Sequence, residues 1–223
     1  MKLTQACYNI EITLEEEKAT TLVIENRKAM LDIVGDLITQ SRGGDGEFVL
    51  SDNGKELKVD KTMDVIINPF DINLNNKKIQ TALYKRLEEV ANDYIQKKEE
   101  LNSAIVNLLD EILEADTDTC YDFDFEFSWN DLFKLYNIRI VEDNDSILEL
   151  IVEYIKIVSC YLGIKIITFV GLDMFFNSDE LDYIITQASY CKVNLLFISA
   201  WELNNSSKSN IWIIDNDKCI IRK

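Results

Sequence analysis

The chain has 223 residues, 47% of them hydrophobic, with 40 Asp and Glu against 23 Lys and Arg. This length and apolar content suffice for one buried core, or for one core with a smaller appendage, and argue against disorder. The formal net charge of −17 opposes indiscriminate binding to nucleic acid or to an anionic membrane, but it is compatible with a local basic surface. The chain has no histidine, which excludes Ser/His and Cys/His nucleophiles, a histidine base and a histidine-held zinc.

The cellular compartment is predicted from three absences. The first twelve residues show no secretory signal, and the most apolar region, 164–176, is too short to cross a bilayer and is broken by Lys165 and Asp173. The five cysteines show no C-x-x-C spacing, which favours reduced thiols over disulfides or zinc. We therefore expect a cytoplasmic protein without a membrane partner.

The first quarter of the chain predicts an α/β domain. Residues 3–14 alternate weakly and predict a first strand, and the β-branched run 21–25 predicts a short, buried second strand. A helix over 30–38 follows, because apolar residues recur at helical spacing until a Gly-Gly pair ends it. Residues 48–50 and 57–59 then predict a hairpin.

Residues 77–115 contain neither glycine nor proline and keep apolar residues at helical spacing. This pattern predicts one long helix, or two helices joined end to end. The chain could bend at 96–100, where the apolar pattern lapses. A helix of this length is expected to form a lobe of its own.

The α/β pattern returns after this helical region. A capping box of Ser146 and Glu149 opens a helix that ends at Gly163. A strand over 166–170, a helix from Asn177 to about Tyr190 and a strand over 193–198 form a βαβ unit, whose strands should be parallel neighbours. A terminal hairpin is predicted from strands at 211–214 and 219–221.

The predicted fold class is therefore α/β, with a head domain built from both ends of the chain. The head covers 1–59 and 130–223, and an α-helical leg domain covering 60–129 is inserted into it. The loop after the second strand, residues 25–28, is where such a sheet would hold a nucleoside triphosphate. This loop has no glycine to form a phosphate cradle and places Glu25 where phosphate would approach, so the head lacks a Walker A motif and we expect no nucleotide hydrolysis.

An acidic stretch at 111–131 is the strongest candidate site. Aromatic residues alternate with acids over 121–127, which predicts a strand with rings on one face and carboxylates on the other. Five carboxylates at near-alternate positions offer hard oxygen ligands for a calcium ion: Asp116, Asp118, Asp122, Asp124 and Glu126. From the pattern alone, a metal site and a solvated acidic strand edge remain equal alternatives. A catalytic magnesium site is less favoured, because no general base is evident nearby.

Basic residues occur in pairs, most of them in the helical region: Arg27 with Lys28, Lys77 with Lys78, Lys85 with Arg86, and Lys97 with Lys98. By itself this pattern favours lysines that solvate an exposed helix face over a binding surface. Contacts with DNA phosphates are the alternative.

Several segments resemble the short form of the Csn2 family, the ring-forming adaptation proteins of type II-A CRISPR systems. They are "MKLT" at the start, "LVIEN" at 22–26, "GEFVLSDNGKEL" at 46–57, "NPFDIN" at 68–73, "DLFKLYNIRI" at 131–140 and "IITFVG" at 166–171. The resemblance spans nearly the whole chain without a single diagnostic motif. Relatives carry a proline after "IEN", where Arg27 stands here.

The resemblance implies a head like a phosphate-loop NTPase domain without nucleotide chemistry, and an inserted helical leg. It also implies a homotetrameric ring, supported by Ca²⁺, whose lysine-lined hole binds the ends of double-stranded DNA without sequence preference. Its partners would be the CRISPR integrase pair and the RNA-guided effector nuclease, and its role would be spacer acquisition in antiviral defence. The calcium ligands would come from the five carboxylates named above, and the paired basic residues would contact DNA.

Two other function classes remain open. A divalent-metal-dependent nuclease would use the acidic cluster, and would lose cutting when Asp122 or Asp124 is neutralised. An acidic DNA mimic would imitate phosphates, block a DNA-binding partner and show no affinity for DNA itself. The paired lysines speak against the mimic, and the missing base speaks against the nuclease.

Overall fold

The computed structural model describes residues 1–116, 118–143, 145–201 and 209–222. Its contacts divide the chain into two compact units: unit 1, Met1–Leu74 with Glu142–Lys223, and unit 2, Asn75–Val141, which is inserted between them. Each unit is considered by itself.

Unit 1 contains a six-stranded sheet with the order β10-β9-β3-β8-β7-β6. The strands are β3 (Ala19–Ile24), β6 (Met63–Ile66), β7 (Ile166–Val170), β8 (Asn194–Ser199), β9 (Ser209–Ile214) and β10 (Ile220–Arg222). Neighbours from β9 to β6 pair in parallel, and β10 pairs antiparallel with β9. Every residue of β3 and β8 is buried, as expected for parallel strands covered on both faces, and neither sequence alternates between apolar and charged residues. The predicted parallel pair and the terminal hairpin are confirmed.

A second, antiparallel sheet has the order β2-β1-β4-β5. Its strands are β1 (Lys2–Gln5), β2 (Ile10–Thr13), β4 (Phe48–Asp52) and β5 (Lys55–Leu57). The single strand predicted over 3–14 is wrong: the chain turns back between β1 and β2, with Asn9 at φ 50°. The predicted hairpin β4–β5 is confirmed, and its turn places Asn53 at φ 48° and Gly54 at φ 78°, as a type I′ turn requires.

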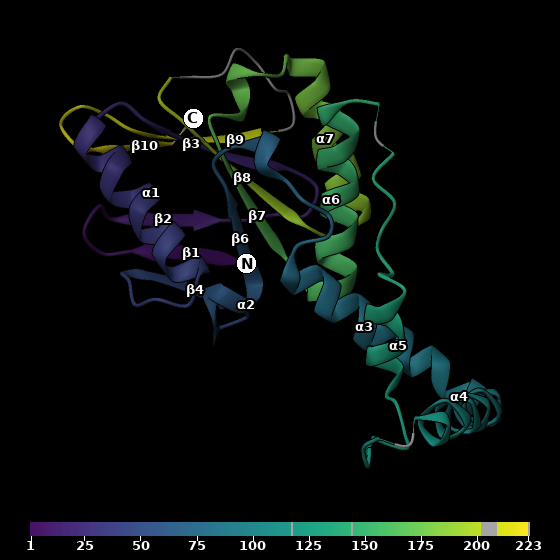
Figure 1. Ribbon diagram of the computed structural model, residues 1–223. Helices are drawn as coiled ribbons and strands as arrows, with labels where there is room; N and C mark the ends of the chain where they lie inside the picture. The colour runs from purple at the N-terminus through teal and green to yellow at the C-terminus, as the bar shows by residue number, and fades with distance from the viewer. Residues whose placement is uncertain (117, 144, 202–208, 223) are drawn as a thin grey trace. The chain divides into compact units, whose positions relative to one another are not determined.

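Helices cover the six-stranded sheet on both faces (Figure 1). Helix α1 (Arg27–Ser41) buries Ala29, Ile33 and Leu37 in one core with the second sheet and with alternate residues of the larger sheet, such as Leu22 and Ile198. Helices α6 (Ile147–Leu162) and α7 (Ser178–Tyr190) lie on the opposite face. The short helices of unit 1 are α2 (Val59–Thr62), η1 (Pro69–Asp71) and η3 (Leu172–Met174).

The helix ends of unit 1 follow their sequence signals. The Ser146 hydroxyl accepts from the Glu149 amide at 3.2 Å, and Gly163 ends α6 at φ 68°. The Glu149 carboxylate, however, accepts from the Asp145 amide rather than from Ser146, so the predicted box is only half formed. Asn177 caps α7 with a complete capping box to Glu180.

Unit 2 consists of α3 (Lys77–Ala91), η2 (Asn92–Tyr94), α4 (Ile95–Ala115) and α5 (Trp129–Leu135). Two helices joined end to end are thus confirmed, with the break at η2 instead of 96–100. The Asn75 side chain closes the unit by donating to the Ile140 carbonyl at 3.0 Å and accepting from the Ile140 amide at 2.8 Å.

The unit boundaries lie at 74/75 and 141/142, against the predicted 59/60 and 129/130. Residues 60–74 fall in unit 1 because β6 adds an edge strand to the large sheet beside β7. Residues 130–141 fall in unit 2 because α5 packs on α3, where the Tyr84 and Phe133 rings are 5.8 Å apart. The fold class is mixed α/β, as predicted. Among the described helices, none is both long and apolar enough to span a membrane.

Candidate nucleic-acid interface

The junction between β3 and α1 is the place where a phosphate-loop protein would hold its nucleotide. Here it is a two-residue connection, Glu25 and Asn26. The Asn26 Oδ1 accepts from the amides of Lys28 and Ala29, both at 3.1 Å, and so occupies the N–H groups that a phosphate would need. Its Nδ2 donates to the Asn216 carbonyl at 2.9 Å.

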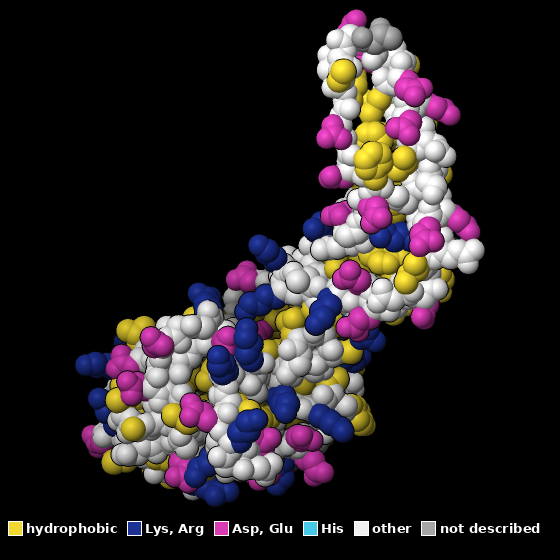
Figure 2. Space-filling view, turned by 90° about the horizontal axis from the view of Figure 1, so that it is seen from below, with side chains coloured by type: hydrophobic (Ala, Val, Ile, Leu, Met, Phe, Trp, Pro, Cys, Tyr) yellow, Lys and Arg dark blue, Asp and Glu magenta, His cyan; other side chains and the backbone are white. Residues whose placement is uncertain are grey.

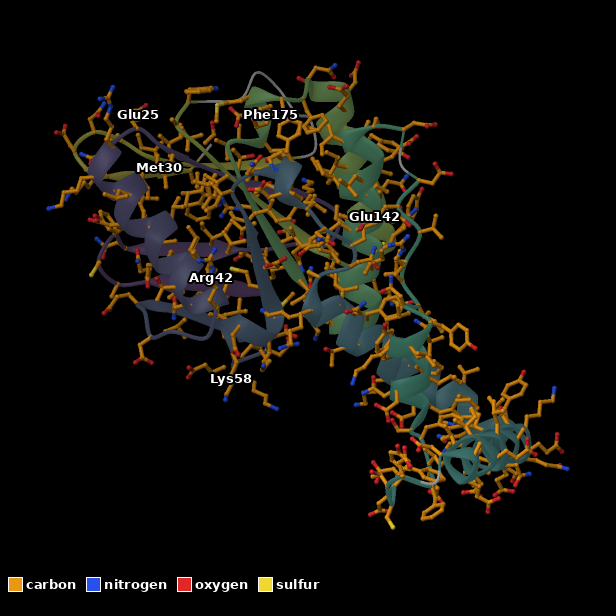
Figure 3. All side chains as sticks on the ribbon, in the orientation of Figure 1. Glu25, Met30, Arg42, Lys58, Glu142 and Phe175 are labelled. Carbon is orange, nitrogen blue, oxygen red and sulfur yellow. The ribbon has the colours of Figure 1, made fainter. Side chains whose placement is uncertain are left out.

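Glu25 completes this closed junction. It lies at the start of α1, beside the β9–β10 hairpin (Figure 3). Its amide donates to the Ile214 carbonyl at 2.9 Å, and its carboxylate accepts from the Asn216 side chain at 3.3 Å. The backbone here forms no cradle for phosphate, so the absence of a Walker A motif in the sequence is matched by the local geometry.

Helices α1 and α3 begin in the same unusual way. Each has an asparagine cap followed by two basic residues: Asn26, Arg27 and Lys28 in unit 1, and Asn76, Lys77 and Lys78 in unit 2. The Asn76 Oδ1 accepts from the amides of Lys78 and Ile79 at 3.0 and 3.1 Å, as Asn26 does in α1. Neither helix has an acidic residue in its first turn, where the helix dipole favours one.

The basic first turns add formal charge to a helix end that is already positive. Because the asparagine caps occupy the free amides of both helix starts, a polyanion would be bound by the charged lysine and arginine side chains and not by the backbone. All four side chains, Arg27, Lys28, Lys77 and Lys78, are exposed. This arrangement is a charge pattern suited to phosphate groups in each unit.

The other two predicted basic pairs lie further along unit 2. Lys85 and Arg86 are exposed in the middle of α3, and Lys97 and Lys98 lie in the first turn of α4. Ion pairs among the described residues join Lys2 to Glu11 at 2.7 Å and Lys61 to Asp60 at 3.3 Å. Apart from Arg86, the basic residues predicted to contact DNA therefore form no ion pair with a carboxylate among the residues that the structure describes.

Lys97 and Lys98 border an apolar groove of about 450 Å³ within unit 2. The Lys97 Nζ lies 5.6 Å from the centre of the Tyr94 ring, and the Lys98 Nζ lies 5.5 Å from that of Phe127. The groove is lined mainly by Leu87, Val90, Tyr94, Leu101, Trp129 and Phe133. The sequence analysis did not predict it, because Leu87, Tyr94 and Leu101 belong to three successive elements, α3, η2 and α4.

The acidic segment 118–128 is not a strand, contrary to the prediction. It has no regular secondary structure and runs along α4, where the Asn102 Nδ2 donates to the Phe125 carbonyl at 2.6 Å. Phe123 and Phe127 are half-buried, whereas Tyr121 and Phe125 are exposed, so the rings do not form one buried face. The strand prediction failed because alternation alone does not supply a neighbouring strand with which to pair.

The five predicted calcium ligands are exposed, and they are not gathered. Asp116 accepts hydrogen bonds from the Tyr121 hydroxyl and from the Asp118 amide, which lower the pKa of its carboxyl group. Within the residues that the structure describes, no three acidic or cysteine side chains approach closely enough to hold a metal ion. The donor chemistry suits calcium, but the arrangement in a single chain does not, because calcium needs six to eight oxygen ligands.

Figure 2 shows how the two kinds of charge are distributed. Lys and Arg side chains are scattered among acids over unit 1. Along unit 2, by contrast, Asp and Glu side chains border a run of hydrophobic ones. The overall negative charge therefore coexists with local basic positions.

Comparison with known proteins gives the family. The family model for CRISPR-associated protein (Cas_Csn2) matches residues 40–218. This match covers β4 to the β9–β10 hairpin and therefore includes all of unit 2. The chain belongs to the CRISPR-associated Csn2 family.

A curated Csn2 protein supports this membership. The CRISPR-associated protein Csn2 of Enterococcus faecalis is 26% identical over 200 residues, which are 88% of this chain and 89% of that protein. Among solved structures, a protein described as an ABC transporter ATP-binding protein from Pyrococcus furiosus matches with a TM-score of 0.40 and 12% identity, over 91% of this chain and 88% of that one. At this TM-score the likeness supports no argument. Membership of the Csn2 family gives the chain a CRISPR-associated role.

Proposed function

We propose that this Csn2-family chain is an adaptation protein that takes part in spacer acquisition by binding the ends of double-stranded DNA without reading their sequence. The observation that carries the DNA-binding part is the pair of asparagine-capped helix starts with two basic residues each and no acid in the first turn. Phosphate contacts of this kind position a duplex but carry no sequence information. A protein that accepts any foreign fragment needs this property.

The ring explains how an acidic chain binds DNA. In a homotetramer the basic residues converge on a central hole, while the carboxylates on the outer surface repel DNA that approaches from the side. Entry through an end is then favoured over side contact. In spacer acquisition the DNA-loaded ring works with the CRISPR integrase pair and the RNA-guided effector nuclease.

The proposed function is binding, without catalysis or nucleotide hydrolysis. The closed β3–α1 junction supports this for nucleotides, because Asn26 occupies the helix amides. A nuclease finds no support in the acidic segment, whose carboxylates do not converge within the described residues.

Calcium binding is proposed from the family resemblance, with Asp116, Asp118, Asp122, Asp124 and Glu126 as the ligand set. Since these carboxylates are apart in the single chain, the ion would require either a rearrangement of the segment or further oxygen ligands from a second chain. No step of DNA binding is assigned to the ion.

The proposal is tested by titrating the protein with two linear duplexes of equal length and unrelated sequence over a series of salt concentrations. Equal affinities that fall steeply with salt, with both duplexes recovered intact, are expected for phosphate contacts. A preference for one sequence would overturn the proposal, and cleavage of either duplex would favour a nuclease. Absence of binding at low salt would favour an acidic DNA mimic.

A further inference from the structure

Exposed apolar side chains lie together on unit 1, at the edge of the large sheet where β6 and β7 end. Ile67 and Phe70 follow β6 and are 50% and 59% exposed, and Met174 and Phe175 follow β7 and are 62% and 48% exposed. Because β6 and β7 are parallel neighbours, the loops after them meet at one edge, where the Phe70 and Phe175 rings are 5.2 Å apart, edge to face. Figure 3 labels Phe175 at this edge. We call these four residues the β6–β7 patch.

The backbone fixes both loops that carry the patch. The Asn68 Oδ1 accepts from the Phe70 amide at 3.2 Å and so caps η1. After β7, Gly171 turns the chain at φ 70°, and its amide donates to the Ile198 carbonyl of β8 at 2.8 Å. The Met174 methyl group lies against Gly171, in the space that the Cβ of any larger residue would take. A partner therefore meets a surface that is already formed, and binding does not have to order it.

The rim of the patch is acidic. Three acids adjoin or closely follow its residues along the chain: Asp71, Asp173 and Asp179. The Asp173 carboxylate accepts from the Ser199 hydroxyl at 2.9 Å, and none of the three forms an ion pair with a described residue. The segments that contain β6, β7, α7 and the start of α6 have no lysine or arginine: 63–74, 142–155 and 166–191. An exposed apolar patch with a polar rim is typical of a protein interaction site.

These properties select one kind of occupant. DNA is disfavoured because the acids repel phosphate, and a second copy of the patch would bring the same acids face to face across a two-fold axis. Arginine suits both features of the surface, since a planar guanidinium stacks on an aromatic face and also pairs with a carboxylate. The exposed rings of Phe70 and Phe175 and the exposed carboxylate of Asp71 offer these contacts.

We propose that the β6–β7 patch binds a partner protein through a segment in which arginine or lysine residues flank an apolar side chain. The apolar side chain covers Ile67 and Met174, while the basic residues contact the two phenyl rings and the acidic rim. Aromatic rings buried at the centre of an interface carry much of the binding energy, and charges at its rim mainly raise the rate of association. The proposal goes beyond DNA binding, because the patch contains none of the basic residues proposed to contact DNA.

The test begins with random peptides displayed on phage and selected against the full chain, without DNA and at physiological salt. We expect the enriched peptides to combine arginine or lysine with a large apolar residue. One such peptide is then synthesised with a fluorescent label, and its affinity for the chain is measured by fluorescence anisotropy. Enrichment of peptides without basic residues, or of no peptide, would overturn the proposal.

A pair of substitutions locates the peptide on the chain. Phe70→Ser with Phe175→Ser should lower the affinity for the peptide about tenfold or more. Tyr190→Ser, the control, removes an exposed ring at the other end of α7 and should have no effect. Equal affinities of the two variants would contradict the patch as the binding site. The phenylalanine variant should keep its affinity for linear duplex and its mass by light scattering. A loss of either would assign the patch to DNA or to a second copy and overturn the proposal.

The acidic rim is tested in the same way, and this variant also serves if the phenylalanine variant fails to fold by circular dichroism. Asp71→Asn with Asp179→Asn should lower the affinity for the peptide several-fold, because the rim then loses two charges. The control is Glu16→Gln with Glu17→Gln, two exposed acids elsewhere in unit 1, which should leave the affinity unchanged. Equal losses in the two variants would show a general attraction of basic peptides to an acidic protein and would overturn the proposal.

Discussion

At the scale of single residues, the asparagine caps explain how basic first turns are tolerated. An N-cap side chain contributes about 1 kcal/mol to helix stability, whereas a basic residue in the first turn opposes the dipole by about 0.3–1 kcal/mol. Asn26 and Asn76 therefore offset the cost of the lysines and arginine that follow them. Both asparagines and the basic residues after them can be read from the sequence. That both asparagines cap a helix is known only from the structure, which shows where α1 and α3 begin.

The pair Lys77 and Lys78 is the cleanest test of phosphate contact, because both side chains are exposed, whereas Lys97 and Lys98 lie against aromatic rings. Lys77→Glu with Lys78→Glu should lower the affinity for linear duplex about tenfold or more at low salt, equally for unrelated sequences, and should flatten the salt dependence. Fluorescence anisotropy over a salt series measures both effects. The control is Lys55→Glu with Lys58→Glu, two exposed lysines at the β5 edge with the same change of charge. Equal losses in the two variants would show a general charge effect and contradict a local site.

Tyr154 predicts a pH dependence of stability. Burial, and then the Asp64 carboxylate to which its hydroxyl donates, raise the pKa of Tyr154. Because the folded protein holds this proton more tightly than the unfolded chain, the stabilisation is complete below the unfolded pKa of about 10 and is lost as the pH rises above it.

Tyr154→Phe removes both the hydrogen bond and its titration. We expect it to lower the free energy of unfolding at neutral pH by about 1–2 kcal/mol, because the Asp64 Oδ2 loses its donor while Oδ1 keeps the Val65 amide. Between pH 9 and 11 it should lose less stability than the unmodified protein does. Urea unfolding at several pH values measures this, with the exposed Tyr183→Phe as control. The same alkaline loss in Y154F and in the unmodified chain would refute the assignment.

At the scale of elements, the sequence predicts most of unit 1 and the helical nature of unit 2. Strand β7, helix α7 and the hairpin β4–β5 are predictable because caps, glycines and buried runs act locally. The conformation of the acidic segment is not predictable in this way. Alternating residues form a strand only beside another strand, and the segment packs against helix α4 instead. The turn at Asn9 was not predicted, because β1 and β2 share one weak alternation of apolar and polar residues.

The candidate site was predicted only as a set of residues. Paired basic residues can be read from the chain, but their exposure depends on the tertiary structure. The apolar groove requires α5 and the start of α4 to meet, which no local pattern indicates. Four apolar residues of α4, Leu101, Ile105, Leu108 and Ile112, keep a helical spacing in the sequence. A buried helix would show the same spacing, and only the exposure of these residues distinguishes the two cases.

The acidic segment predicts a thermal response to calcium. If it binds the ion, millimolar calcium should raise the melting temperature by a few degrees, because a ligand that binds only the folded state stabilises it. Asp122→Asn with Asp124→Asn and Glu126→Gln should abolish this rise. Differential scanning fluorimetry with calcium, magnesium and chelator measures it, and Glu15→Gln with Glu16→Gln and Glu17→Gln is the control. No response in the unmodified protein would contradict the calcium proposal.

At the scale of the whole molecule, the proposed function requires an acidic chain to bind a polyanion. A net charge of −17 makes side contact with DNA unfavourable, whereas the basic residues at the starts of α1 and α3 have no carboxylate partner among the residues that the structure describes. The unit boundaries differ from the predicted ones because β6 pairs with the large sheet of unit 1 and α5 packs on α3 in unit 2. Such long-range pairing cannot be read from composition shifts along the chain.

The central proposal is that double-stranded DNA enters the hole of the ring by one of its ends. The most direct measurement compares binding of one plasmid as a covalently closed circle and after a single cut, at equal concentration and low salt, with DNA integrity checked. The account predicts retention of the linear form and little or no binding of the closed circle. Equal binding of both forms would show side contact and contradict end loading.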